Sequence, residues 1–549
     1  MNNDASTISS AIKDKDAVGI EIKNVSTLSA IPESERETAI DTVAAAEQYT
    51  EEDYKTLVRK IDFVLLPLMW VVYGLQQADK TGISTQATFN MRADLGMKGQ
   101  DYALLTTIFY VSYLVFEAPG NYVMQRTNIG KMLVVFMFFW GVIVLCTGFV
   151  TTWAEMMVLR ALQGALESVI SPAFLLLIGA WYRTSEHTLR SIIWGTSNAG
   201  FGIISSLCMY GIGQAALKNP NGIDAWRGIS YFLGGFTVVM SFSRSPFLGK
   251  IIFRSNPVLP EFRMSSTPRE VWWLSKAEKR MAAARVVGNQ TGSDRTKHGE
   301  WKWHQVRVAF KDPQTYFFFF TTIVNSLPNG GTSSFGSLVY VSFGFSNLET
   351  ILECTVPRNA FSIAWFLFVG LITRRYPKVR FLCMFVAVIP AFVGMLVTAL
   401  QPSDDAHLWS RWGTYFMTVT GDIAGLMIWT FVPSNVAGRT KKSVTSIVLF
   451  VAYCVGNSVG SQVFRAKAPL LIILWAPRYV PAILISAIFY GLEMILFLVW
   501  RCYYIYVNHQ RDKAALAKGL SVEEQERLGR LAAEADVTDY ENDHFRYDY

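Results

Sequence analysis

Charged side chains are scarce in this chain of 549 residues, of which Asp, Glu, Lys and Arg make up 17%. A typical soluble domain contains about 25%. Hydrophobic residues make up 51% of the chain, and they stand in long runs, not in the stripes of an amphipathic helix. This composition excludes a soluble globular protein and predicts a helical protein that crosses a membrane many times.

Cysteine clusters and enzyme motifs are also lacking. The six cysteines are scattered, without the spacing of a metal site or of a disulfide framework. The chain contains no GxSxG, no HExxH and no phosphate-binding glycine loop with a lysine. We therefore expect no enzyme activity, no metal and no cofactor. Basic loops between the apolar runs account for the net charge of +7, so no nucleic-acid partner is expected.

Twelve apolar runs predict an all-α membrane protein with twelve transmembrane helices in two six-helix bundles. The first begins near residue 59, and the others lie near 102–124, 131–150, 153–183, 191–215, from 228, 313–342, 357–373, 380–400, 411–433, 443–464 and 479–507. The expected organisation is a disordered cytoplasmic tail (1–55), an N-terminal bundle (56–243), a cytoplasmic middle loop with a surface helix capped by Thr267 (244–312), a C-terminal bundle (313–508) and a cytoplasmic tail (509–549).

The basic residues gather in the loops on one side of the predicted bundle. This asymmetry predicts that both termini are cytoplasmic, and the plasma membrane is the expected location. Two similar basic segments, QRTNIGK (125–131) and RRYPKVR (374–380), precede the third and the ninth runs. Their equivalent positions support a repeat of two six-helix halves.

The fourth run, residues 153–183, carries Arg160, Gln163 and Glu167. Arg160 and Glu167 are seven residues apart, so both face the same side of a helix, about 10 Å apart along its axis. A charge at the bilayer centre costs at least about 2.5–3.5 kcal/mol. Two charges on one face therefore predict an ion or substrate pathway; the alternative is a structural ion pair that locks helix packing.

The first run adds Gln77, Asp79 and Lys80. Two carboxylates in the membrane, Asp79 and Glu167, could each carry a proton. Lys80 could hold a negatively charged substrate, and Arg160 could stabilise a carboxylate after its proton leaves. The alternative is that all four charged groups form salt bridges within the N-terminal half.

Polar residues in other runs are weaker candidates. FEAPGN in the second run, with the basic loop after it, predicts a packing and gating motif of Glu117, Asn121, Arg126 and Lys131. Asn325 and Asn329 are one turn apart in the seventh run, beside a glycine pair that suits a broken or gating helix. They are candidate substrate contacts together with Asn457. The alternative for these asparagines is helix packing.

Several segments resemble one transporter family. They are RKIDFVLLPL, ADKTGIS, FEAPGN, RALQGALES, NGGTSSFGSL, NVAGRTKKS, GNSVGSQVF and APRY. The chain resembles a major facilitator transporter of the anion:cation symporter family, in the fungal allantoate permease group. The resemblance implies that Asp79 and Glu167 carry protons, that Lys80 binds a substrate carboxylate and that Arg160 pairs with Glu167. In the sugar-acid branch of the same family, an arginine stands at the position that corresponds to Lys80. A lysine cannot form the two parallel hydrogen bonds that an arginine makes with a carboxylate.

The expected function is the import of a small organic anion with protons by a monomer in the lipid bilayer. The family's range covers allantoate, ureidosuccinate, small peptides and carboxylate vitamins. The alternative is a nutrient receptor that does not transport. Two stretches, 243–266 and 468–475, interrupt the apolar pattern and are interpreted as extra sequence, from retained introns or a faulty gene prediction. The alternative is that residues 246–253 complete the sixth helix and that Arg244 reaches the membrane surface or faces the cavity.

Overall fold

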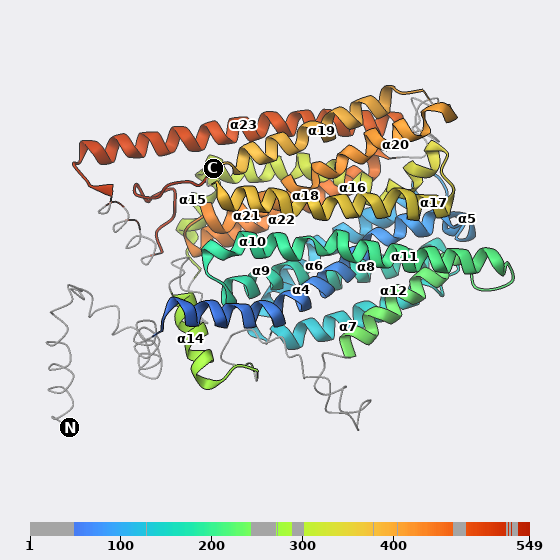
Figure 1. Cartoon of the computed structure of the whole chain (residues 1–549), viewed down its shortest axis with the longest axis horizontal. Coiled ribbons are helices and arrows are strands. Elements are labelled where there is room, and N and C mark those ends of the chain that lie inside the picture. Colours follow the sequence, from blue (N-terminus) through green and yellow to red (C-terminus); the bar gives the residue numbers. More distant parts are fainter. Residues whose placement is uncertain are drawn as a thin grey trace.

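The regular elements are all helical in the part of the chain that is described (Figure 1). This computed structural model describes residues 49–127, 129–242, 271, 273–287, 301–376, 378–402, 404–464, 479–522, 525, 529 and 536–549. The stretches 243–266 and 468–475 lie outside these residues. The helices run nearly parallel, and we call the end of the bundle where the first helix begins and the chain ends the terminal end.

In its described residues, the N-terminal half contains six membrane crossings, two of them interrupted. Its helices are α4 (Glu51–Thr88), the short α5 (Met91–Asp94), α6 (Asp101–Arg126), α7 (Ile129–Thr147), α8 (Trp153–Glu167) continued by α9 (Ile170–Trp181), α10 (Thr184–Gly195) continued by α11 (Ser197–Lys218), and α12 (Ala225–Phe242).

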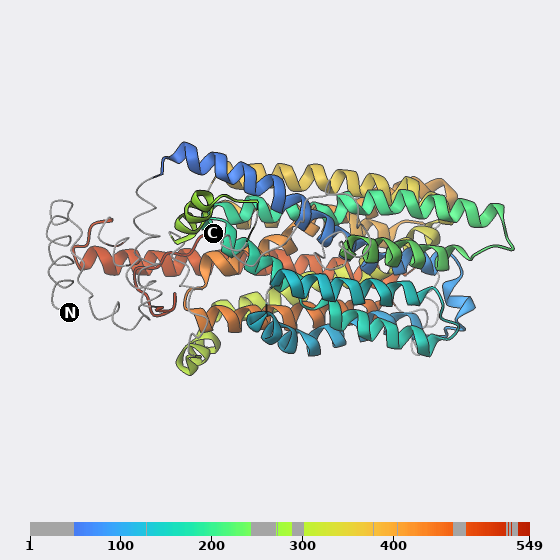
Figure 2. The same cartoon turned by 90° about the horizontal axis from the view of Figure 1, so that it is seen from below.

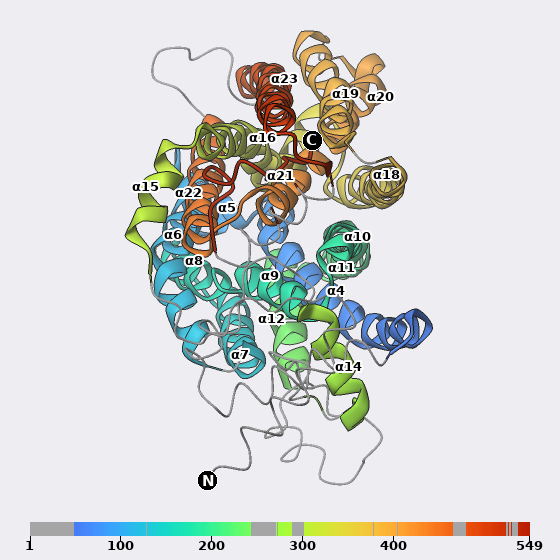
Figure 3. The same ribbon diagram turned by 90° about the vertical axis from the view of Figure 1, so that its left-hand side faces the viewer.

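The C-terminal half repeats this plan. It comprises α16 (Pro313–Phe343), α17 (Asn347–Glu349) with a π-turn (Thr350–Thr355) and α18 (Val356–Arg375), α19 (Arg380–Leu400), α20 (Leu408–Phe416) with a 3₁₀ turn (Met417–Thr420) and α21 (Asp422–Asn435), α22 (Arg439–Val463), and α23 (Val480–Ala517). Figure 3, a view along the helices, shows the two halves as two groups that meet along α6 and α22 on one side and along α10, α11 and α18 on the other. The predicted twelve-helix fold is confirmed.

Not every crossing is a single long apolar helix without interruption. Six helical segments among the described residues are long and apolar enough to cross a membrane by length and composition. The first crossing, α4, falls outside this group and carries Asp79 and Lys80, while the fourth is divided between α8 and α9.

The two halves are joined by hydrogen bonds far from the terminal end. The Tyr102 hydroxyl donates to the backbone oxygen of Ser334 at 2.6 Å, and the Ser337 backbone nitrogen donates to Ser84 Oγ at 2.9 Å. Gln462 Nε2 donates to Thr107 Oγ1 at 2.7 Å. Each bond joins a helix of one half to a helix of the other, so this end of the bundle is closed by direct contacts.

The surface helix of the middle segment is shorter than the predicted one, which spans 267–287. Val271 and Trp273–Ser275 are not helical, and α14 (Lys276–Val287) begins after Ser275. The Glu278 backbone nitrogen donates to Ser275 Oγ, and the Ser275 backbone nitrogen donates to Glu278 Oε2. Ser275 is therefore the N-cap of α14, in place of the predicted Thr267. Trp273 stacks on Trp181 of α9. A second helix, α15 (Trp303–Lys311), leads into α16.

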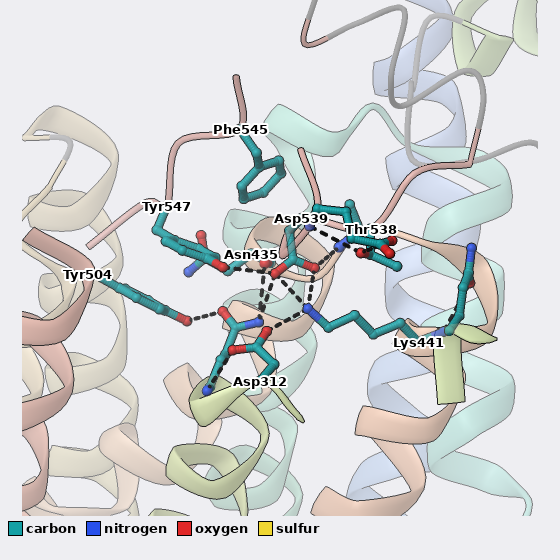
Figure 4. A network of polar contacts seen from close by, with 12 residues as sticks. Asp312, Asn435, Lys441, Tyr504, Thr538, Asp539, Phe545 and Tyr547 are labelled. Atoms are coloured by element: carbon teal, nitrogen blue, oxygen red, sulfur yellow. Dashed lines mark hydrogen bonds and ion pairs between the residues drawn. The ribbon is translucent and has the colours of Figure 1, made fainter. Parts of the chain in front are cut away.

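The last helix, α23, projects beyond the others at the terminal end (Figure 2). The residues that end the chain, 536–549, return to the C-terminal half, and we call them the C-terminal segment. Figure 4 shows Lys441 Nζ between the carboxylates of Asp312, at 2.5 Å, and Asp539, at 2.8 Å. All three side chains are fully buried. An ion network without solvent contact therefore attaches the chain end to the first turns of α16 and α22.

Aromatic and amide contacts complete this attachment. Tyr547 stacks on Tyr504 of α23, with ring centroids 4.5 Å apart, and its hydroxyl donates to Asp539 at 3.0 Å. The side chain of Asn435 pairs with the backbone of Asp548 through two hydrogen bonds of 2.9 and 2.7 Å. The C-terminal segment is thus packed against the bundle like part of its core.

Candidate functional site

A buried polar cluster joins α4 to α8 near the middle of the N-terminal half. The side chains of Asp79, Arg160 and Glu167 are 6%, 5% and 0% exposed. Gln163 connects them: its Nε2 contacts Asp79 Oδ2 and donates to Glu167 Oε1 at 3.2 Å. Its Oε1 accepts from Arg160 Nη1 at 2.8 Å. One neutral amide therefore links both carboxylates and the guanidinium.

The expected ion pair between Arg160 and Glu167 is not formed. A spacing of seven residues places these side chains about 10 Å apart along the helix, and Gln163 occupies the turn between them. Among the described residues, no two of Asp79, Lys80, Arg160 and Glu167 approach within the 4 Å of a salt bridge. The alternative in which all four form salt bridges is therefore also wrong.

Two further side chains belong to this cluster that sequence reasoning did not place there. Trp140 of α7 donates its ring N–H to Asp79 Oδ2 at 3.1 Å, and Gln76 Nε2 donates to Glu167 Oε2 at 3.3 Å. Gln77, the predicted substrate contact, is only half-buried and interacts with Tyr73. Adjacent helical residues point about 100° apart, so only one of the two glutamines can face the carboxylates, and it is Gln76.

Lys80 lies in an aromatic cage built by both halves. Its Nζ is 5.3 to 5.8 Å from the ring centroids of Phe109, Tyr110 and Tyr113 on α6 and of Tyr453 on α22. Cation–π contacts of this kind favour a desolvated ammonium group. Because no carboxylate of the described residues lies within 4 Å of Nζ, the ammonium can accept an anion without breaking an existing ion pair.

The cluster keeps unused hydrogen-bonding capacity. Arg160 Nε and Gln76 Oε1 are buried and have no hydrogen-bond partner among the described residues. An unsatisfied buried group costs about 1–3 kcal/mol. A ligand, a water or a proton carrier between α4 and α8 would therefore find both a donor and an acceptor.

The predicted gating motif is described only in part. Glu117 is buried in α6 and interacts electrostatically with Cys454 of α22. The side chains of Asn121, Arg126 and Lys131 lie outside the described part of the structure. Their gating role stays a prediction.

The predicted asparagines of the C-terminal half contact other helices of that half. Asn325 Nδ2 donates to Glu493 of α23 at 2.9 Å, and Asn329 Nδ2 donates to Asn457 of α22 at 2.9 Å. Glu493, fully buried, was not among the predicted site residues. These amides are partnered, which favours packing over direct substrate contact.

The glycine pair of α16 does not break the helix. A Cβ at Gly330 would lie 2.3 Å from the backbone of Asn457, and a Cβ at Gly331 would lie 2.1 Å from the ring of Phe464. The helix continues from Pro313 to Phe343. The glycines let α22 approach α16 closely, as small residues do in membrane bundles, so the expected broken helix is replaced by a packing contact.

The comparisons with known proteins agree with this architecture. Residues 69–461 match the model of the Major Facilitator Superfamily. The chain belongs to this superfamily. Allantoate permease of Saccharomyces cerevisiae is 30% identical over 91% of this chain and 87% of that protein. An uncharacterized transporter of Schizosaccharomyces pombe is 30% identical over 91% of both chains, and a thiamine pathway transporter of S. cerevisiae is 26% identical over 90% of this chain and 86% of that protein.

A solved structure confirms the fold. A bacterial homologue of the human lysosomal transporter Spinster, in an inward-facing and unoccupied conformation, superposes with a TM-score of 0.53 at 13% identity, over 79% of this chain and 96% of that one. The resemblance to the fungal allantoate permease group is confirmed by the relatives. The protein is an integral membrane transporter of this superfamily and not an enzyme.

Proposed function

We propose that this transporter is a proton-coupled symporter that imports a small organic anion. One observation carries the proposal: Gln163 links two buried carboxylates, while Lys80 beside them has no carboxylate within ion-pair distance. The carboxylates are the proton carriers, and Lys80 is the contact for the anion. Arg160, hydrogen-bonded to Gln163, stabilises the carboxylates when they are ionised.

Counting charges explains why the anion and the proton travel together. With both carboxylates ionised, Asp79 and Glu167 balance Lys80 and Arg160. A bound monoanion adds one negative charge, and one proton on a carboxylate restores neutrality. Because an uncompensated charge in the membrane costs at least about 2.5–3.5 kcal/mol, anion and proton each favour the binding of the other. A second proton would make transport respond to the membrane potential, by about 2.3 kcal/mol per 100 mV.

The remaining parts of the proposal concern context. The basic loops support an orientation with both termini in the cytoplasm. The fungal permease relatives support the plasma membrane as the location, and we propose that the protein acts as a monomer. The substrate range of the group, which includes allantoate, ureidosuccinate, small peptides and carboxylate vitamins, supplies the substrates to test.

Uptake of labelled members of this range tests the proposal, in cells that lack their own permeases. The wild type should accumulate at least one of them, faster when the medium is acidified. Glu167→Gln should abolish uptake driven by a pH gradient and retain exchange of labelled for unlabelled substrate. Glu155→Gln, the same change on the exposed first turn of α8, is the control. If Glu167→Gln keeps the pH dependence of the wild type, Glu167 is not a proton carrier.

A further inference from the structure

The surface helix α15 (Trp303–Lys311) lies across the bundle axis at the terminal end. Only Asp312 separates it from α16, which begins at Pro313. Figure 3, which looks along the bundle, shows α15 lengthwise at the edge of the molecule, whereas the transmembrane helices are seen end-on. Because α16 crosses the membrane, a helix that lies across its beginning lies in the plane of the membrane surface.

The protein itself covers the inner face of α15. Gln305, Val308 and Ala309 are buried there, and Gln305 Oε1 accepts from a backbone nitrogen in the first turn of α22 at 2.9 Å. Beside this face, Lys302 and His304 bind acidic residues of the C-terminal segment at 2.7 and 2.6 Å. These polar groups are therefore satisfied within the protein.

The opposite side of the helix, which we call the α15 outer face, combines aromatic and basic side chains. Trp303, Arg307 and Phe310 follow one another at helical spacing on one face, and Lys311 stands next to them. Trp303 is 71% and Phe310 is 52% exposed. Arg307 and Lys311 are exposed as well, and neither has a hydrogen-bond or ion-pair partner among the described residues. Exposed aromatic side chains gathered in one place indicate an interaction surface.

The α15 outer face continues into the lipid-facing surface of α16. The Tyr316 hydroxyl donates to the Phe310 backbone oxygen at 3.0 Å, which joins the first turns of α16 to the end of α15. Tyr316 and Phe320, one turn apart on α16, are both exposed. Exposed aromatic residues on a transmembrane helix face lipid, and tyrosine and tryptophan are enriched where the membrane meets water. The surface next to the α15 outer face is therefore covered by the membrane.

We propose that the α15 outer face docks on the cytoplasmic leaflet and binds the head groups of anionic phospholipids. Trp303 and Phe310 lie at the boundary between head groups and acyl chains, as the aromatic residues of interfacial helices do. The stems of Arg307 and Lys311 lie along this apolar surface, and their charged ends reach the phosphates. The cytoplasmic leaflet carries the anionic lipids that attract basic segments next to a transmembrane helix.

This inference goes beyond the proposed transport function. It uses the proposed orientation only to assign the α15 outer face to the cytoplasmic leaflet. A nanodisc with the same lipids in both leaflets tests the lipid contact whichever way the protein is oriented in the cell. Failure of the inference is therefore distinct from failure of the proposed orientation or transport.

Hydrogen–deuterium exchange measures docking of the full-length protein in nanodiscs of phosphatidylcholine, alone or mixed with phosphatidylserine. In the wild type, the amides of residues 303–311 should exchange about tenfold or more slowly in the mixed membrane, since each basic residue near an anionic surface favours binding about fivefold. The double variant Arg307→Gln with Lys311→Gln should lose this difference between the two membranes. Lys276→Gln with Arg280→Gln is the matched control. It removes two exposed charges at the same spacing from α14 and should keep the difference.

Three outcomes would overturn the proposal. They are equal exchange of the wild type in both membranes, a difference that survives in the double variant, and a difference that the control variant also loses. A rise in salt concentration should shrink the difference in the wild type, because salt screens charges at the membrane surface. This measurement needs no substitution and decides the question if the double variant does not fold. Inorganic phosphate added to phosphatidylcholine nanodiscs should give no protection; equal protection would assign the site to a soluble anion and refute docking on the membrane.

Discussion

Replacing Lys441 by methionine should release the C-terminal segment from the bundle. Methionine keeps most of the length of the side chain and removes the ammonium group that lies between Asp312 and Asp539. Both carboxylates would then remain in a site without solvent contact and without a cation. Breaking a buried ion pair by removing one partner typically costs about 3–5 kcal/mol.

Undocking is the least costly way for the protein to avoid this penalty. Asp539 belongs to the C-terminal segment, so moving residues 536–549 into water hydrates its carboxylate while the helices stay in place. A cost of 3–5 kcal/mol corresponds to a factor of more than about 100 in the ratio of docked to undocked segment.

Hydrogen–deuterium exchange of the full-length protein measures this ratio. The backbone amides of residues 536–549, protected in the wild type, should exchange much faster in Lys441→Met. Lys302→Met is the matched control, because Lys302 also binds the segment, at Asp536 (2.7 Å), but the two side chains are 47% and 25% exposed. A surface pair of this kind contributes about 0–1 kcal/mol. Equal protection in Lys441→Met and the wild type would refute the idea that the buried network holds the segment.

Three further predictions concern pH, the anion contact and helix packing. Burial and the neighbouring Asp312 raise the pKa of Asp539, although Lys441 acts in the opposite direction. Docking of the C-terminal segment should therefore be strongest in acid and weaken as the pH rises through the raised pKa. In the same exchange experiment, the segment of Asp539→Asn should dock without this pH dependence. Lys80→Gln should weaken the affinity for a transported carboxylate about tenfold or more at unchanged expression, because a charged hydrogen bond contributes about 1.5–3 kcal/mol. Normal affinity of this variant in an uptake assay would place the anion site elsewhere, and the face of Asn325 and Asn329 would be the next candidate. Gly460→Ala should lower the free energy of unfolding by about 1–3 kcal/mol, because the added Cβ would lie 2.0 Å from the Leu327 backbone oxygen. Gly336→Ala is the control, since a Cβ at Gly336 meets open space, and this variant should show no such loss of stability in thermal unfolding.

The fold could be predicted because a membrane crossing is a local property of the sequence. The ninth run, 380–400, coincides with α19 (Arg380–Leu400), and the seventh, 313–342, differs from α16 by one residue at its end. The sequence does not predict the irregular turns within crossings four, five, eight and ten. Apolar composition continues through Ser168 and Val169 between α8 and α9, so hydropathy gives no sign that the helix is interrupted there.

The candidate site was predictable only as far as helical periodicity reaches. The spacing of Arg160 and Glu167 correctly placed both on one buried face, but periodicity does not show which groups from other helices meet that face. Trp140 lies 61 residues after its partner Asp79, and Tyr453 reaches Lys80 from the other half of the protein. Neither residue carries a charge that would mark it in an apolar run. The aromatic cage could therefore be found only from the assembled bundle.

The C-terminal segment shows how average composition conceals a buried contact. Residues 509–549 are rich in charge and were interpreted as a cytoplasmic tail, which predicts no packing. Within 536–549, however, acids alternate with aromatic residues, and Asp539 meets Lys441 from 98 residues upstream. A carboxylate can be buried in a core when a cation and several hydrogen-bond donors surround it. The carboxylate of Asp539 interacts with Lys441, the Ala437 backbone nitrogen and the Tyr547 hydroxyl. Because Asp312 and Lys441 stand at the first turns of α16 and α22, the segment holds together the terminal ends of two helices that also carry the asparagine contacts and Tyr453. A chain cut after α23 would lose this attachment, so the segment belongs to the C-terminal half as a structural element and not to a dispensable tail.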